Sequence, residues 1–148
     1  MTTLTNTITI QAPADQIWAI LTNLAELEKY DPTVAKSTVT SAKPTGCGAT
    51  RKVTMKDGKH WFNEQITAFE PAIALTFELT SCNFPIKNLS HSYSFAAEEG
   101  QTTVTQIMRY TPRYGVAGKL MDAVAIRRRS DSGVKKFFDG LKARVEGT

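Results

Sequence analysis

Residues 49–66 have the sequence ATRKVTMKDGKHWFNEQI, in which two alternating runs of side chains flank Asp57-Gly58. An Asp-Gly pair in this setting predicts a two-residue type I′ hairpin turn, because that turn requires positive φ. Such a turn also fixes the register of the two strands. The expected cross-strand pairs are Met55 with His60, Val53 with Phe62, Arg51 with Glu64 and Ala49 with Ile66. Most of these side chains are apolar, so we expect this face to be the interior of a sheet.

Two further turn signals extend the same face. A symmetric turn at Glu70-Pro71 and a turn at Glu99-Gly100 each join alternating runs. The first pairs Ile66 with Leu75, Glu64 with Phe77 and Phe62 with Leu79. The second pairs Phe95 with Val104, Tyr93 with Gln106, His91 with Met108 and Leu89 with Tyr110. Residues 34–112 are therefore predicted to form an antiparallel meander.

Segments with helical spacing of apolar residues precede and follow this meander. Residues 3–10 alternate as a first strand, and apolar residues then recur at helical spacing over about 13–29, as one helix or two short ones. After Pro112 a long helix is predicted from an apolar stripe: Ala117, Leu120, Met121, Val124, Val134, Phe138, Leu141 and Val145. Arg127 or Arg128, with Asp131, would face inward between the two halves of the stripe and form a polar mouth. We expect one domain, residues 1–148.

The charge is uneven along the chain. The net charge is +4, and residues 109–148 hold ten Lys/Arg and four Asp/Glu. This basic segment is either a solvated helix face or a surface for an anionic partner. The two cysteines, Cys47 and Cys82, have no metal-ligand or redox spacing and are expected as free thiols. We expect a cytoplasmic protein without a membrane span, a monomer or weak homodimer, and no nucleic-acid partner.

A polar minority lies on the predicted inner face: Arg51, Glu64, His91, Tyr93 and Gln106. Burial without partners would cost on the order of 2 to 7 kcal/mol for each neutral polar group. Two interpretations remain open at this point. The five side chains satisfy one another, or they line a cavity. Residues 80–88, with Phe84, Pro85 and Ile86, would form a portal loop in the second case.

The order of these elements resembles the SRPBCC superfamily, which includes START lipid-transfer domains, polyketide cyclase/dehydrases and plant pathogenesis-related ligand binders. The resembling features are Pro13-x-x-x-Ile17-Trp18, Glu64-x-Ile66, the 95–100 hairpin, and Tyr110-x-Pro112 before the final helix. The resemblance implies an α+β helix-grip fold: a seven-stranded curved antiparallel sheet around a long C-terminal helix, with two short helices after the first strand. It implies a hydrophobic cavity but no universal catalytic set.

Three functions remain open. The first is binding of a small hydrophobic, aromatic or lipid-like ligand, without a cofactor or metal. Its expected ligand-binding residues are Arg51, Phe62, Glu64, Phe77, His91, Tyr93, Gln106, Met108 and Tyr110. The second is a polyketide cyclase/dehydrase-like enzyme with Glu64, His91 and Tyr93 as acid-base groups, although Arg51 would hold Glu64 ionised and weaken it as a base. The third is an interaction module on the basic helix.

Overall fold

The computed structural model describes residues 1–147 of the 148-residue chain. Seven antiparallel strands form one sheet in the order β1-β7-β6-β5-β4-β3-β2. Their bounds are β1 Thr2–Ile10, β2 Val34–Val39, β3 Thr50–Met55, β4 Trp61–Glu70, β5 Ala74–Cys82, β6 Ile86–Glu98 and β7 Gln101–Pro112. Two short helices follow β1, namely α1 (Ala14–Leu21) and the 3-10 helix η1 (Leu24–Lys29). The predicted antiparallel meander and pair of short helices are confirmed.

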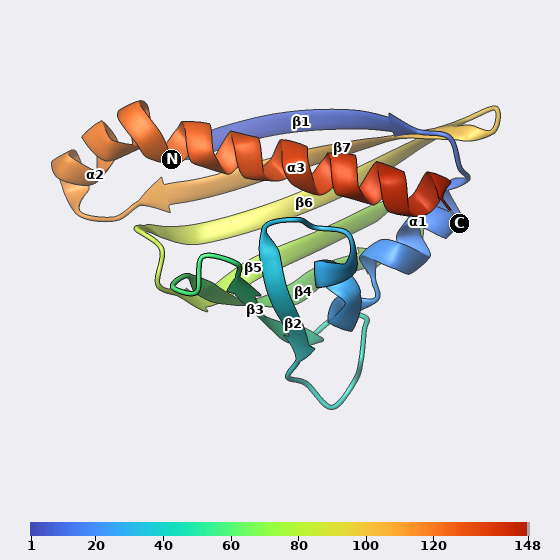
Figure 1. Cartoon of the computed structure of the whole chain (residues 1–148), viewed down its shortest axis with the longest axis horizontal. Coiled ribbons are helices and arrows are strands. Elements are labelled where there is room, and N and C mark those ends of the chain that lie inside the picture. Colours follow the sequence, from blue (N-terminus) through green and yellow to red (C-terminus); the bar gives the residue numbers. More distant parts are fainter. Residues whose placement is uncertain (148) are drawn as a thin grey trace.

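The C-terminal helix has three parts: α2 (Gly115–Met121), the π-helical segment η2 (Asp122–Ile126) and α3 (Arg127–Glu146). It runs along the curved sheet, and α3 packs on β1 (Figure 1). This is the expected α+β helix-grip fold. No helix within the described residues is both long and apolar enough to cross a membrane.

The β3–β4 hairpin has the predicted register but not the predicted turn. Arg51 pairs with Glu64 and Val53 with Phe62. Of the two turn residues only Gly58 has positive φ, at 73°. The Asp57 carboxylate instead accepts hydrogen bonds from the backbone N–H groups of Lys59 and His60, at 2.8 and 2.9 Å. The type I′ assignment was therefore wrong, because the aspartate side chain organises a longer loop.

The β4–β5 register was predicted wrongly by two residues. Glu64 pairs with Leu79 and Ile66 with Phe77, across a bulge between Ile66 and Ala68. Because this shift is even, Glu64 and Ile66 keep their predicted face. Beyond a further bulge between Asn63 and Glu64, Phe62 pairs with Cys82, three residues from its predicted partner Leu79, and it still lines the cavity. In the β6–β7 hairpin the inner pairs from Phe95 to His91 have the predicted partners. Leu89 does not pair with Tyr110, since a second bulge shifts the register between Lys87 and Ser90.

The helix stripe is correct only in its C-terminal half. Val134, Phe138, Leu141 and Val145 are buried. Leu120 and Val124 are exposed, and the residues that face inward there are Gly118 and Asp122. The residues that face inward recur every four positions from Gly118 through Ile126. The π-helical segment η2 has more residues per turn than an α-helix, so residues at this spacing stay on one face of the helix.

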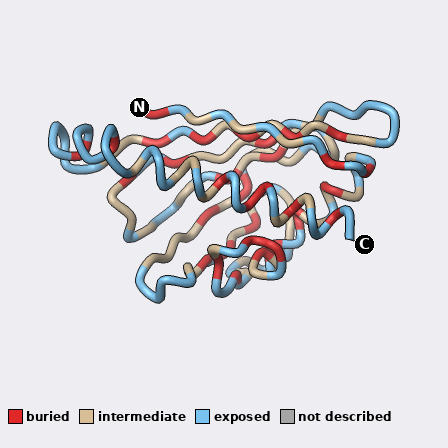
Figure 2. Tube along the Cα trace, turned by 45° about the horizontal axis from the view of Figure 1, so that its top comes forward, coloured by how far each residue is buried: buried red, intermediate tan, exposed pale blue. Residues whose placement is uncertain are grey.

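Buried segments extend over much of the sheet, and several of the fully buried residues lie where α1, η1 and the last turns of α3 meet it (Figure 2). These residues include Ile10, Ile17, Leu24, Leu141 and Val145. At Gly140 a Cβ atom would lie 1.8 Å from the carbonyl oxygen of Tyr30, so only glycine permits this approach. The N-terminal half of α3 lacks such contacts and overlies a cavity.

Candidate functional site

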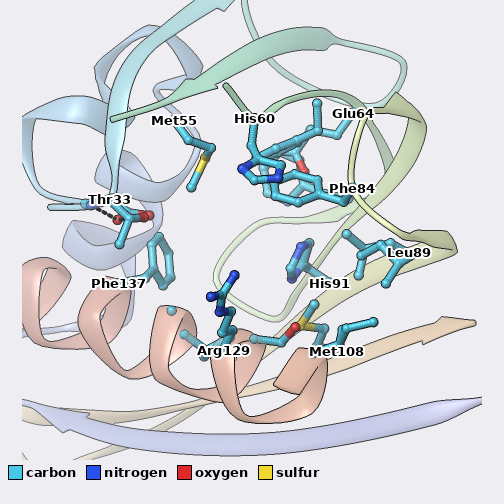
Figure 3. Close-up of a pocket in the computed structure, with 18 of the residues that line it drawn as sticks. Thr33, Met55, His60, Glu64, Phe84, Leu89, His91, Met108, Arg129 and Phe137 are labelled. Carbon is cyan, nitrogen blue, oxygen red and sulfur yellow. Dashed lines mark hydrogen bonds between the residues drawn. The ribbon is translucent and has the colours of Figure 1, made fainter. Parts of the chain in front are cut away.

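A cavity of about 490 Å³ lies between the sheet and the C-terminal helix (Figure 3). Strands β3 to β7 supply one wall, and η2 and α3 supply the other. The segment that follows η1 and the loop before β6 close its sides. A site of this size is within the usual range for small-molecule ligands. Its walls are mainly aliphatic and aromatic, with a few polar groups.

An ion pair is buried at the wall formed by β3 and β4. The Arg51 Nε atom donates to Glu64 Oε1 at 2.6 Å, and both residues are buried. The guanidinium also lies over the Phe77 ring, 4.5 Å from its centroid. Burial is the largest single effect and lowers the pKa of Arg51, but the charge and hydrogen bond of Glu64, together with Tyr30 and Tyr93, outweigh it, so the pKa is raised and the guanidinium stays charged. Arg51 Nη1 has no hydrogen-bond partner among the described residues.

A second polar cluster lies on β6 and β7. Gln106 Nε2 donates to Tyr93 Oη at 3.1 Å and lies 3.3 Å from His91 Nδ1. Burial raises the pKa of Tyr93 and lowers the pKa of His91. Both groups are therefore neutral near pH 7. Gln106 Oε1 is buried and has no hydrogen-bond partner in the described part of the chain.

Aromatic and basic side chains surround the rim. His60 stacks on Phe84 with ring centroids 4.9 Å apart, and its Nδ1 contacts the Asp57 carboxylate. Arg129 points from the helix into the space between Phe137 and His91 (Figure 3). The polar break expected from Arg127 or Arg128 with Asp131 was therefore placed wrongly. Asp131 contacts Asn6 and Lys135 instead.

The structure brings together most of the residues singled out from the sequence. Eight of the nine expected ligand-binding residues line the cavity, and these include the acid-base candidates Glu64, His91 and Tyr93. Tyr110 does not line it. Its hydroxyl donates to Asp122 beneath the start of the C-terminal helix, and burial raises its pKa to about 12. Phe84, Pro85 and Ile86 also line the cavity.

Sequence reasoning missed the wall opposite the sheet. The missed residues on that wall are Ala125, Ile126, Arg129, Ser130, Gly133 and Phe137, and those missed at the side of the cavity are Leu27, Asp31 and Thr33. Met121, which was placed in the apolar stripe, lines the cavity as well. Phe137 was detectable, because it lies three residues after Val134 on the same helix face. Gly133 and Ala125 could not be predicted from the sequence, since a small residue indicates a cavity only when the positions of the surrounding helices and strands are known.

The site offers no metal-binding cluster. Over residues 1–147, no group of three or more His, Cys, Asp and Glu side chains is placed to hold a metal ion. Cys47 and Cys82 are free thiols, as expected.

Comparisons with known proteins agree with this geometry. A family model described as polyketide cyclase/dehydrase and lipid transport matches residues 1–146. No curated protein matched the chain. Among solved structures, the protein TTHA0849 from Thermus thermophilus is 17% identical, with a TM-score of 0.83 and 99% and 98% of the two chains covered.

Two further solved structures share the fold. A START superfamily protein from Mycobacterium smegmatis is 11% identical, with a TM-score of 0.81 and coverage of 98% of this chain and 97% of that one. The major latex-like protein 151 of Panax ginseng is 12% identical, with a TM-score of 0.77 and coverage of 97% and 96%. At these identities the likeness establishes the fold alone.

Proposed function

Because the chain belongs to the polyketide cyclase/dehydrase and lipid transport family of the SRPBCC superfamily, we propose that it binds a small hydrophobic, aromatic or lipid-like molecule between its sheet and C-terminal helix. The observation that carries the proposal is the cavity of about 490 Å³, which the helix leaves open. Phe62, Phe77 and Met108 contribute apolar walls for such a ligand. Met108 adapts its shape readily, because its side chain is unbranched.

The polar groups on the sheet wall of the cavity favour an uncharged oxygen on the ligand. The Arg51 and Glu64 charges cancel within one ion pair. His91 and Tyr93 are neutral because burial opposes their charged forms. A ligand carboxylate would therefore find no uncompensated cation in this part of the wall. A hydroxyl or carbonyl group, which costs less to desolvate, fits it better.

Ligand binding without catalysis is better supported than acid-base catalysis. As an enzyme of the cyclase/dehydrase type, the protein would use Glu64 as a base and His91 or Tyr93 as proton donors. Glu64 is engaged with Arg51, however, and burial raises the pKa of Tyr93, which weakens it as a proton donor. If a substrate is found, unchanged turnover by Glu64→Gln and His91→Ala variants would exclude this mechanism.

The test is to identify what the cavity holds. Native mass spectrometry of the purified protein should show a bound small molecule, and solvent extraction should release it for identification. The extracted protein should then bind the neutral dye N-phenyl-1-naphthylamine with a blue-shifted emission, and the released molecule should displace it. Extracted protein that takes up neither the dye nor the released molecule would contradict the proposal.

A further inference from the structure

Five apolar side chains are exposed together at the start of the C-terminal helix. They are Tyr114 (70% exposed), Val116 (85%), Leu120 (66%), Met121 (42%) and Val124 (68%), and together they form the α2 tip. Val116, Leu120 and Val124 recur every four residues, so they follow one line along the helix. Figure 2 shows that this end of the molecule is largely exposed.

The opposite side of the same helical segment is polar and fixed. Asp122 is buried and accepts hydrogen bonds from Thr2 Oγ1, at 2.5 Å, and from the Tyr110 hydroxyl. Gly118 lies so close to the backbone that a Cβ atom would fall 1.5 Å from the Arg113 carbonyl oxygen. These contacts prevent the segment from rotating its apolar line inward. The usual amphipathic order is therefore reversed here, with a carboxylate inside and aliphatic side chains outside.

Positive charge surrounds the α2 tip. Residues 109–130 hold six Lys/Arg and one acidic residue, which is the buried Asp122, whereas the whole chain has a net charge of only +4. Beside the tip, Lys87, Lys119 and Arg127 line a groove of about 390 Å³ between the end of β7 and α2. Arg128 is exposed four residues after Val124, at the end of the apolar line.

We propose that the α2 tip binds the surface of membranes that contain anionic lipids. The aliphatic side chains enter the interfacial region, and the flanking lysine and arginine side chains meet lipid phosphates. Apolar side chains and basic residues on one exposed helical face are the combination that such binding requires. The proposal does not depend on what the cavity holds.

The charges around the α2 tip favour a membrane over a second copy of the chain or a nucleic acid as its binding partner. A second copy of the chain would bring two cationic tips together, and they would repel each other. A nucleic acid would need aromatic side chains for stacking, and Tyr114 is the one aromatic residue of the tip. Met121 belongs to the tip and also lines the cavity, so a bound membrane would lie next to the cavity mouth.

Vesicle co-sedimentation tests the proposal directly. The wild-type protein should sediment with vesicles of phosphatidylcholine and phosphatidylglycerol, but not with pure phosphatidylcholine, and high salt should release it. The double variant Leu120→Glu/Val124→Glu should bind at least about tenfold more weakly, since it loses two inserted side chains and adds repulsion. Circular dichroism should be unchanged, because both positions are exposed.

Matched control variants test whether membrane binding depends on the α2 tip itself or on exposed apolar and basic side chains in general. Ile73→Glu removes another exposed apolar side chain, in the turn between β4 and β5 at the other end of the sheet, and should bind like the wild type. Lys119→Glu/Arg128→Glu should lose binding, whereas Lys36→Glu/Lys136→Glu, with the same charge change elsewhere, should lose much less. The proposal is overturned if the wild type does not bind anionic vesicles, or if the tip and control variants bind them equally. It is also overturned if sedimentation equilibrium shows a wild-type dimer that Leu120→Glu/Val124→Glu dissociates.

Discussion

At the scale of single residues, the interior pair Arg51 and Glu64 has the clearest energetic consequence. Both charges lie on the inner face, 6% and 3% exposed, and each compensates the other. Removing one partner leaves an uncompensated buried charge, which costs about 3–5 kcal/mol, whereas apolar replacement of both is often neutral. We therefore expect that the pair is not required for folding and that it contributes to ligand binding instead.

The prediction compares single and double variants. Glu64→Gln should lower the free energy of unfolding by about 3 kcal/mol, while Arg51→Met/Glu64→Leu should lie within about 1 kcal/mol of the wild type. Urea unfolding followed by circular dichroism measures both. The double variant should nevertheless lose affinity for the co-purifying ligand. A double variant as unstable as the single one would show that the pair contributes to stability instead.

His91 makes stability depend on pH. Burial lowers its pKa in the folded protein below the ordinary value of 6.5, so the unfolded chain binds the proton more tightly. Stability therefore falls as pH drops below about 6.5, by at most about 1.4 kcal/mol per pH unit. In His91→Asn this slope should be reduced. Urea unfolding at a series of pH values from 7 to 5 tests it, and identical slopes for both proteins would contradict the assigned cause.

At the scale of elements, the hairpins explain how far sequence reasoning reached. Asp57-Gly58 and Glu99-Gly100 placed β3 against β4 and β6 against β7, because short turns leave few possible registers. The bulges after Ile66 and Lys87 were not predictable, since an extra residue in a strand has no distinct pattern of residue types. Their effect on the site was small, because Glu64, His91 and Tyr93 still line the cavity.

For the C-terminal helix, in contrast, sequence reasoning assigned residues to the wrong face. The apolar residues Leu120 and Val124 were assigned to the core by the rule that apolar residues face inward, and both face outward. Asp122 takes the inner position because Thr2 and Tyr110 lie there to bond it. Partners so distant in the sequence cannot be identified from the helix alone. The cavity wall formed by η2 and α3 was missed for the same reason.

Two glycines of α3 give a prediction at this scale. A methyl group at Gly140 would collide with the Tyr30 carbonyl, so Gly140→Ala should destabilise the fold by about 3 kcal/mol or more. At Gly133 an added Cβ meets nothing within 4 Å, so Gly133→Ala should stabilise the helix by about 0.5–1 kcal/mol. Thermal unfolding of both variants measures the contrast. Equal effects would mean that α3 does not approach the Tyr30 carbonyl as closely as described.

At the scale of the whole molecule, the fold separates rigid packing from open space. The core holds α1, η1 and the end of α3 against the sheet, while the start of the C-terminal helix is held by Asp122. Between these two anchors the helix spans the cavity without filling it. An unfilled apolar space forgoes contacts that would stabilise the fold, so the protein retains this cavity at a cost in stability.

A side chain that fills the cavity should therefore raise the stability of the fold and weaken ligand binding. Gly133 lines the cavity with room for a side chain, so Gly133→Phe should bury an aromatic ring and raise the stability of ligand-free protein by about 1–2 kcal/mol, or several degrees in Tm. A ligand that binds only the folded state raises Tm, by an amount that grows with the ratio of its concentration to its dissociation constant. N-phenyl-1-naphthylamine should accordingly raise the Tm of the wild type and of Gly133→Ala, but not of Gly133→Phe. If Gly133→Phe binds the dye with wild-type affinity and shows the same rise in Tm, the dye does not use the part of the cavity beside Gly133.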